Sequence, residues 1–353
     1  MALSTYEQRE WDRLQERKAA SLNKQARSLL PQQARDRLAS LGQKAMSAPG
    51  AGKVAAAYGG AAKGLGKAVG GTASRTVSKN RVIEQYRRAG HDLAGLDEIR
   101  GLDLRVVDEV ARHNLVRYGH ALSAAATGLG SAAAVTGGEV LVSAGTIAGA
   151  GAGAAPGFGT VAGAMVADAA MMLALATRVV AATALCYGYC PSDPEEELFA
   201  MSVIALGMST GTSAKTAAYA ELSQLTQLLA RNAPWAKLNE KVLTRIAQSF
   251  AAKFAQQLPK RKLGQFVPVA GMAVGAGLSY MLIDRIAVSA RDAYRERFLI
   301  EKSGCDLAGV PSSYDADLGQ DDDAIGVIEL LREEDALPTS DPSDDEGQSD
   351  SQA

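Results

Sequence analysis

The sequence predicts an all-α protein built as a helical bundle, and three observations support this. Long apolar runs recur along the 353 residues, proline occurs at only 11 positions, and the period-two alternation typical of half-buried strands is nearly absent. Apolar residues make up 47% of the chain, yet only 5% are aromatic and 36 residues are glycine. We therefore expect apolar helices, rich in glycine and alanine, that pack tightly through close approach of their backbones.

Composition divides the chain into four regions. Residues 1–45 form a charged N-terminal helical region, 46–79 a basic Gly/Ala-rich arm or linker, 80–305 a helical core, and 306–353 a disordered acidic tail. Residues 1–305 hold 36 Lys and Arg against 24 Asp and Glu, whereas the tail holds one basic and 15 acidic residues. A basic body before an acidic tail indicates an anionic partner, which is a membrane, a nucleic acid or the tail itself.

The first residues, the cysteine content and the segment 46–79 bear on the location of the protein and on surface binding. The first 18 residues lack the apolar core of a signal peptide, and three cysteines do not suit a disulfide framework, so we expect a reducing cytoplasmic environment. The segment 46–79 contains basic residues and no acidic one. Two interpretations stay open for it, a flexible linker or an arm that lies on an anionic surface. In the second, the contact residues are Lys53, Lys63 and Lys67.

The middle of the core is unusually apolar and glycine-rich. Residues 140–167 carry no charge over 28 positions, more than the ~20 that span a bilayer. The seven large apolar residues in this run contribute only about −2 to −4 kcal/mol to insertion. The run therefore suits either a packed soluble bundle or helices that insert after assembly. On a helix, glycines four residues apart form a ridge that another backbone can approach closely. The predicted ridge residues are Gly145, Gly149, Gly153, Gly157, Gly159, Gly163, Gly271 and Gly275.

We find no pattern typical of catalysis or of a cofactor site. The glycines between Gly157 and Gly163 match a dinucleotide fingerprint only in part and follow no predicted strand, and neither Gly-Lys pair of the arm precedes Ser or Thr. Cys186 and Cys190 have no histidine nearby in the sequence, which argues against a metal site. No basic patch is interleaved with aromatic residues, so nucleic acid is not an expected partner. We expect no enzymatic activity, no cofactor and no metal.

Two further helices are predicted after the glycine run. Residues 195–210 follow Pro194 and begin with acidic residues, as the first turn of a helix favours. Residues 234–258 place apolar residues at steps of three and four, which predicts an amphipathic helix. This second helix either faces the core or seeks an anionic surface with its basic side. The membrane-surface residues are then Lys237, Lys241, Arg245 and Lys253.

The acidic tail is expected to be disordered because it lacks bulky residues and carries high charge. The exception is Ile325–Leu331, which is predicted to form a short helix that docks on the body. Either the tail is solvated and only aids solubility, or it competes with anionic lipid for the basic body. In the second case, its contact points are the Asp321–Asp323 cluster and the short helix.

Two blocks of sequence resemble the EcsC family. The first contains Tyr187-Gly188-Tyr189 followed by Asp193-Pro194-Glu195, and the second contains Pro268 and Gly271 followed later by Arg297. The opening from Tyr6-Glu7 to Trp11 is also similar to the start of that family. At Ser279-Tyr280, the family pattern leads us to expect an Asn before the aromatic residue. The resemblance implies a bacterial, helical, membrane-related protein and carries over no catalytic residue, because the activity of the family is not established.

Together these observations predict a membrane-associated helical protein linked to transport or envelope processes. The alternative is a soluble helical adaptor or regulatory protein whose glycine ridges form an ordinary core. The expected partners are an anionic membrane surface, an ABC transporter or another membrane protein, and a second copy of the chain. The expected location is the cytoplasmic side of the bacterial membrane, peripheral or partly inserted, with the cytoplasm as the alternative.

Overall fold

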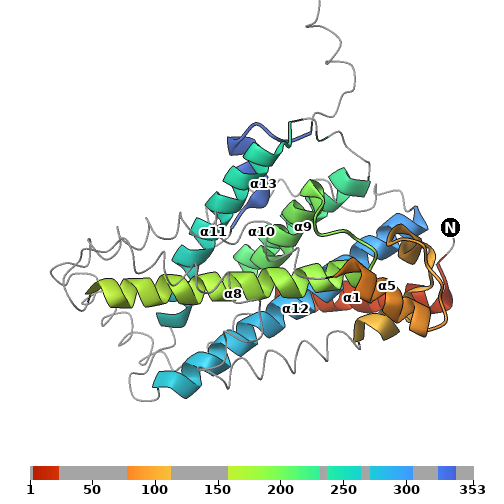
Figure 1. Ribbon diagram of the computed structural model, residues 1–353, viewed down its shortest axis with the longest axis horizontal. Coiled ribbons are helices and arrows are strands. Elements are labelled where there is room, and N and C mark those ends of the chain that lie inside the picture. The colour runs from red at the N-terminus through yellow and green to blue at the C-terminus, as the bar shows by residue number, and fades with distance from the viewer. Residues whose placement is uncertain are drawn as a thin grey trace, which may run out of the picture.

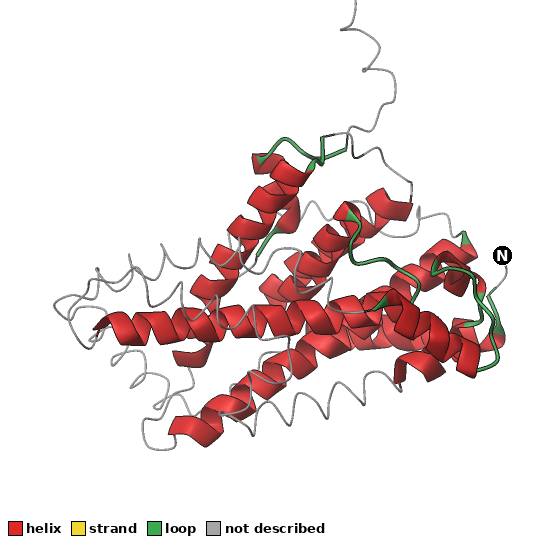
Figure 2. Ribbon diagram, viewed as in Figure 1, coloured by secondary structure: helices red, strands yellow, loops and turns green. Residues whose placement is uncertain are grey.

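The computed structural model describes residues 3–23, 78–112, 158–230, 235, 237–263, 271–304 and 325–338. Within these ranges all regular structure is helical, which confirms the predicted fold class (Figure 2). The elements in chain order are α1 (Thr5–Asn23), α5 (Lys79–Arg88), the 3₁₀ turn η1 (Asp97–Gly101), α8 (Phe158–Cys186), α9 (Pro194–Met208), α10 (Thr212–Ala230), α11 (Glu240–Leu263), α12 (Gly271–Ser303) and α13 (Val327–Glu333). Residues 104–112 are also helical.

Helix α9 lies at the centre of the bundle and is apolar on all sides. Asp193 is its N-cap residue, Pro194 follows at the first turn, and three glutamates continue that turn, as the sequence predicts. Every residue from Leu198 to Met208 is buried, which is the pattern of a helix enclosed by neighbours. Those neighbours are α8, α10, α11, α12 and α13.

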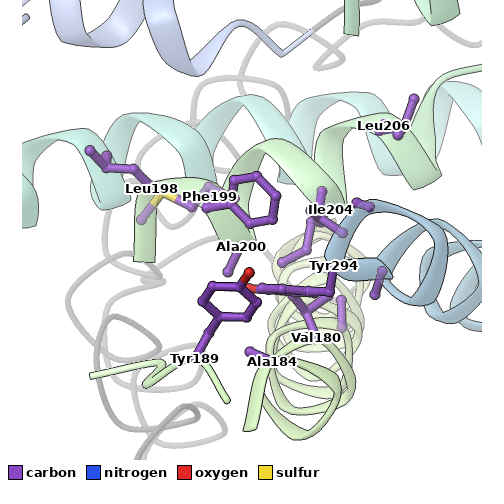
Figure 3. Packing of buried hydrophobic residues seen from close by; sticks show 14 of the residues in the cluster. Val180, Ala184, Tyr189, Leu198, Phe199, Ala200, Ile204, Leu206 and Tyr294 are labelled. Atoms are coloured by element: carbon purple, nitrogen blue, oxygen red, sulfur yellow. The ribbon is translucent and has the colours of Figure 1, made fainter. Parts of the chain in front are cut away.

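Helices α8 and α12 are the two longest elements and pack against each other. Both have their amino-terminal ends toward the left of the long axis in Figure 1, and α1 and α5 lie at the opposite end. Helix α12 also crosses α9 closely, because a Cβ placed on Gly207 would lie 2.7 Å from the Cα atom of Ile286. Aromatic and aliphatic side chains fill the space around this crossing, with Phe199 of α9 beside Tyr294 of α12 (Figure 3).

The carboxyl end of α8 carries the first family motif. Gly188 has a φ angle of +86°, and its N–H donates to the carbonyl of Leu185 while the N–H of Tyr189 donates to that of Ala184. This is the Schellman pattern of helix termination, in which the glycine position favours a left-handed backbone. A Cβ at Gly188 would also lie 2.8 Å from the carbonyl oxygen of Leu96, so the turn leaves no room for a side chain.

The four composition regions do not correspond to separate packed units in the described residues. Helix α1 comes from the charged N-terminal region, yet it contacts α10 and α12. Helix α13 comes from the acidic tail, yet it packs against α9, α10 and α11, so disorder does not hold for 325–338. A short helix docks on the body as predicted, with its apolar residues buried, but it spans Val327–Glu333 rather than Ile325–Leu331. Residues 46–77 and the remainder of the tail lie outside the described part.

Candidate functional site

Charged side chains are buried where the carboxyl-terminal half of α12 meets α1, α9 and residues 97–112. Three cations of α12 meet four anions from the other segments there, and we call this set the ion network. Its members are Glu7, Glu10, Asp108, Glu196, Arg295, Arg297 and Lys302.

Arg295 forms the first part of the ion network with α1 and the helix at 104–112. Its Nη2 atom lies 2.6 Å from Oδ1 of Asp108, and its Nη1 atom lies 2.9 Å from Oε2 of Glu10. The hydroxyls of Tyr187 and Tyr6 donate to the two oxygens of Asp108 at 3.1 and 2.8 Å. Burial and the hydrogen bond to Asp108 raise the pKa of Tyr6 to about 12. Asp108 therefore connects three separate segments of the chain.

Arg297 forms the second part with α9. Its two terminal nitrogens bind both oxygens of Glu196, and its Nε atom lies 2.7 Å from Oε1 of Glu301. The guanidinium also stacks 4.1 Å from the ring centroid of Tyr189, whose hydroxyl donates to Glu301. Burial raises the pKa of Glu196 despite the attraction of Arg297. A planar guanidinium supplies such a two-point bond, which a lysine cannot.

Lys302 and Glu7 form the third part. The N–H of Glu7 bonds to Oγ of Ser4, and the N–H of Ser4 bonds back to Oε2 of Glu7, so the two residues form a capping box at the start of α1. The other oxygen of Glu7 accepts from Lys302 at 2.6 Å and from the N–H of Leu104 at 3.1 Å. Burial acts to raise the pKa of Glu7, but these donors outweigh it and lower the pKa below its ordinary value.

The ion network joins segments that are far apart in the sequence. Its carboxylates and cations are paired, and burial raises the pKa of Tyr187 and Tyr189, which favours their neutral, hydrogen-bond-donating form. No group of three or more metal-ligating side chains occurs in the described ranges. The arrangement instead fixes the relative position of α1, α9 and α12.

The family-motif residues divide between this ion network and the surface. Tyr187 and Tyr189 donate to network carboxylates, and Arg297 is a network member, whereas Asp193 and Pro194 are exposed at the start of α9. Glu195 is half-buried, and the next residue, Glu196, is the one that binds Arg297. Glu196 was not among the predicted site residues, although a glutamate in the first turn of an otherwise apolar helix is a signal of a buried partner. Pro268 lies outside the described residues, and Gly271 begins α12.

A second candidate site is the surface of the bundle on which α13 of the acidic tail packs. Helix α13 covers parts of α9, α10 and α11, and we call the surface beneath it the tail groove. Glu221 of α10 accepts a hydrogen bond from the N–H of Ile328 at the first turn of α13. Around the edge, Lys237, Arg245 and Lys253 each bind an acid of the tail segment.

The predicted membrane-surface residues fall into two groups. Lys237, Arg245 and Lys253 lie at the edge of the tail groove, where Asp335, Glu334 and Glu329 bind them at 2.9, 3.0 and 3.4 Å, and Lys241 is exposed on the same helix. Helix α11 is amphipathic as predicted, but it spans Glu240–Leu263 rather than 234–258. It begins after Asn239, whose side chain accepts from the N–H of Val242. The arm residues Lys53, Lys63 and Lys67 lie outside the described part.

The predicted glycine ridge is described only in part. Gly159 and Gly163 are helical residues of α8, and Gly271 and Gly275 are helical residues of α12. Gly145, Gly149, Gly153 and Gly157 lie outside the described residues, so the ridge stays a prediction there. Among the described residues, a helical glycine that allows close approach of two helices is Gly207 of α9, which was not among the predicted ridge residues.

These features define an all-α bundle that is held together by buried ion pairs and terminated by a docked acidic segment. The chain belongs to the EcsC protein family, whose family model matches residues 5–299. That match includes α1 and most of α12, and it ends before α13. No curated protein and no solved structure matches the chain.

Proposed function

We propose that the protein associates with a membrane surface through the end of the bundle where α8 and α12 begin. The observation that carries this proposal is the common direction of the two helices, which places their amino-terminal ends toward one end of the long axis (Figure 1). The sequence of α12 is uncharged from Gly271 to Ile283, and that of α8 has Asp168 as its only charge before Arg178. An apolar end opposite the charged one suits a membrane surface.

Exposed apolar side chains at this part of α12 support the proposal. Tyr280 and Met281 are 46% and 45% exposed, and Val288 follows one heptad after Met281 with 42% exposed. Large aromatic and apolar residues next to an uncharged helix suit the interfacial region of a bilayer. This patch lies on the same helix as the ion network, so the network fixes its orientation relative to the remainder of the bundle.

Peripheral association suits the chain better than a span. Among the described helices, Ala169–Cys186 of α8 is long and apolar enough to cross a bilayer, but 72% of that stretch is buried inside the bundle. Moving α8 into a bilayer would break its packing against α9 and α12, and this packing forms the core of the bundle. We propose no catalytic step, because the buried phenols and carboxylates of the ion network serve as structural partners. Anionic lipid adds attraction of about 1 kcal/mol per basic residue near the surface.

Vesicle flotation with full-length protein tests the proposal. We expect Tyr280→Asp with Met281→Asp to reduce binding to anionic vesicles at least tenfold, because two charges would enter the contact surface. Arg88 is exposed at the end of α5, and Arg88→Glu changes the net charge by the same two units at the far end of the bundle, so it should reduce binding much less. Equal loss in the two variants would mean that net charge alone governs binding, which would rule out a specific membrane-facing end.

A further inference from the structure

Helix α13 docks through an apolar face that is almost completely enclosed. The side chains of Val327, Leu330 and Leu331 are at most 1% exposed, although the surrounding tail is the most acidic part of the chain. Their spacing of three and four residues places them on one face of the helix. An apolar helix face that lies in a groove between other helices is a known mode of peptide recognition.

Polar contacts fix the position of this helix at both ends. At the start, Glu221 accepts from the backbone of Ile328, and Gly326 leaves space there, because a Cβ at that position would lie 3.2 Å from the Cβ atom of Glu329. At the end, the segment closes on itself, because the N–H of Ala336 donates to the carbonyl of Leu331, and Asp335, with a φ angle of +50°, binds Lys237 of the body. The body therefore contacts the helix near both ends as well as along its apolar face.

The edge of the groove is basic and the segment is acidic. Three cations of the α11 side bind three acids of the segment, and the acids Asp335 and Glu329 are 92% and 63% exposed. Exposed ion pairs of this kind contribute little energy each and are weakened by salt. They select an acidic helix over a basic one and leave the docked state reversible.

We propose that the tail groove is a docking site for a short, acidic, amphipathic helix, and that residues 325–338 are its intramolecular occupant. A partner protein with apolar residues at the positions of Val327, Leu330 and Leu331, and acids at those of Glu329 and Glu334, binds by displacing the tail. The tail segment is part of the same chain, with 20 residues between Gly304 and Ile325, so it competes with a partner as an intramolecular ligand. The tail thus sets the affinity that a partner must exceed.

The test is a peptide-binding experiment on full-length protein. The variant Leu330→Asp with Leu331→Asp changes only the tail and should vacate the groove. A fluorescent peptide of residues 322–338 with the natural sequence should bind this variant at least tenfold more tightly than it binds the parent, and should bind less tightly at high salt. The control peptide carries the same two Asp substitutions and should bind neither protein. Equal binding of the natural peptide to parent and variant, or no binding to a folded variant, overturns the proposal.

Hydrogen exchange of the parent chain provides a measurement that does not depend on a variant. The amides of 327–333 should exchange through a local opening, faster than those of α9 and α12. Exchange of these amides only at the global unfolding rate would make α13 a permanent part of the core and overturn the proposal. Excess unlabelled peptide should further increase the exchange of the chain's own segment.

Anionic vesicles test the alternative that the tail groove binds lipid rather than a helix. If vesicles displace the tail and the peptide does not, the basic edge of the groove binds lipid, and the proposal of a helix-docking site is wrong. This result is separate from the proposed membrane association, which depends on Tyr280 and Met281 of α12. If the protein binds the peptide but not vesicles, the docking site stands and the proposed membrane association is wrong.

Discussion

Arg297 of α12 binds both carboxylate oxygens of Glu196 on α9, with nitrogen–oxygen distances of 2.9 and 2.6 Å. Both side chains are buried, so the pair joins two central helices in a place that water does not reach. Removing one partner of a buried pair leaves a charge without compensation, whereas replacing both partners by apolar residues of similar volume often restores stability.

We therefore predict that Arg297→Met destabilises the fold by about 3–5 kcal/mol, since Glu196 would stay buried and unpaired. The double variant Glu196→Leu with Arg297→Met should recover a large part of that loss. Chemical denaturation monitored by circular dichroism measures both. A double variant no more stable than the single one would show that Glu301 and Tyr189 depend on the guanidinium as much as Glu196 does.

The crossing of α9 and α12 predicts a steric effect at Gly207. A methyl group there would lie 2.7 Å from the Cα atom of Ile286, and backbone cannot move aside as a flexible side chain does. Gly207→Ala should lower the free energy of unfolding by about 1–3 kcal/mol through overpacking. Gly95→Ala is the control, because nothing lies within 4 Å of a Cβ at that position. Similar melting temperatures for the two variants would contradict the close approach.

Replacing tyrosine by phenylalanine should have different effects on stability at Tyr294 and at Tyr187. The hydroxyl of Tyr294 is buried and has no hydrogen-bond partner among the described residues, whereas that of Tyr187 donates to Asp108. Tyr294→Phe should leave stability unchanged or raise it by about 1 kcal/mol, since an unpaired buried hydroxyl costs free energy. Tyr187→Phe should lower stability by about 1–3 kcal/mol. Thermal melts of the two variants check this, and loss of stability in Tyr294→Phe would indicate a hidden partner for that hydroxyl.

Docking of α13 should depend on pH through Glu221. Burial raises the pKa of Glu221 to about 7 in the docked state, and the nearby charge of Glu329 also raises it. The backbone N–H groups of Ile328 and Val327 and the cation Lys253 lower this pKa, but their effect is smaller than that of burial. An uncovered glutamate titrates near 4.5, so the docked state binds more protons between these two values. Docking is therefore strongest at low pH, weakens as pH rises from about 4.5 to about 7, and levels off above that value.

Peptide affinity for the Leu330/Leu331 variant, measured at pH 5.5, 7 and 8.5, checks this sign. Adding Glu221→Gln should abolish the dependence, because glutamine still accepts a hydrogen bond but carries no charge. The control is Glu333→Gln in the peptide, because Glu333 is exposed on α13. Affinity for this control peptide should depend on pH as it does for the natural peptide. Tighter binding at pH 8.5 than at pH 5.5 would contradict the assigned role of Glu221.

The sequence by itself determined the helical class, the start of α9 at Pro194, the amphipathic nature of α11 and the existence of a short helix in the tail, which lies two residues later than predicted. Each of these depends on local chemistry, such as a proline in a first turn or apolar residues at helical spacing, which a short window of sequence contains. Family membership was predicted from resemblance, which two blocks carry, one around Tyr187-Gly188-Tyr189 and one from Pro268 to Arg297, and it is confirmed by the match over 5–299.

Only the tertiary structure decided which charges are buried together. Asp108 and Arg295 are 187 residues apart, Glu7 and Lys302 are 295 apart, and nothing in either local sequence indicates its partner. The same holds for Lys237 and for Arg245 and Lys253 of α11. The sequence left them open between a membrane surface and other roles, and the fold brings them beside acids of the tail segment. Long-range pairing depends on how helices cross, and the crossing is set by contacts such as Gly207 on Ile286 that no sequence period encodes.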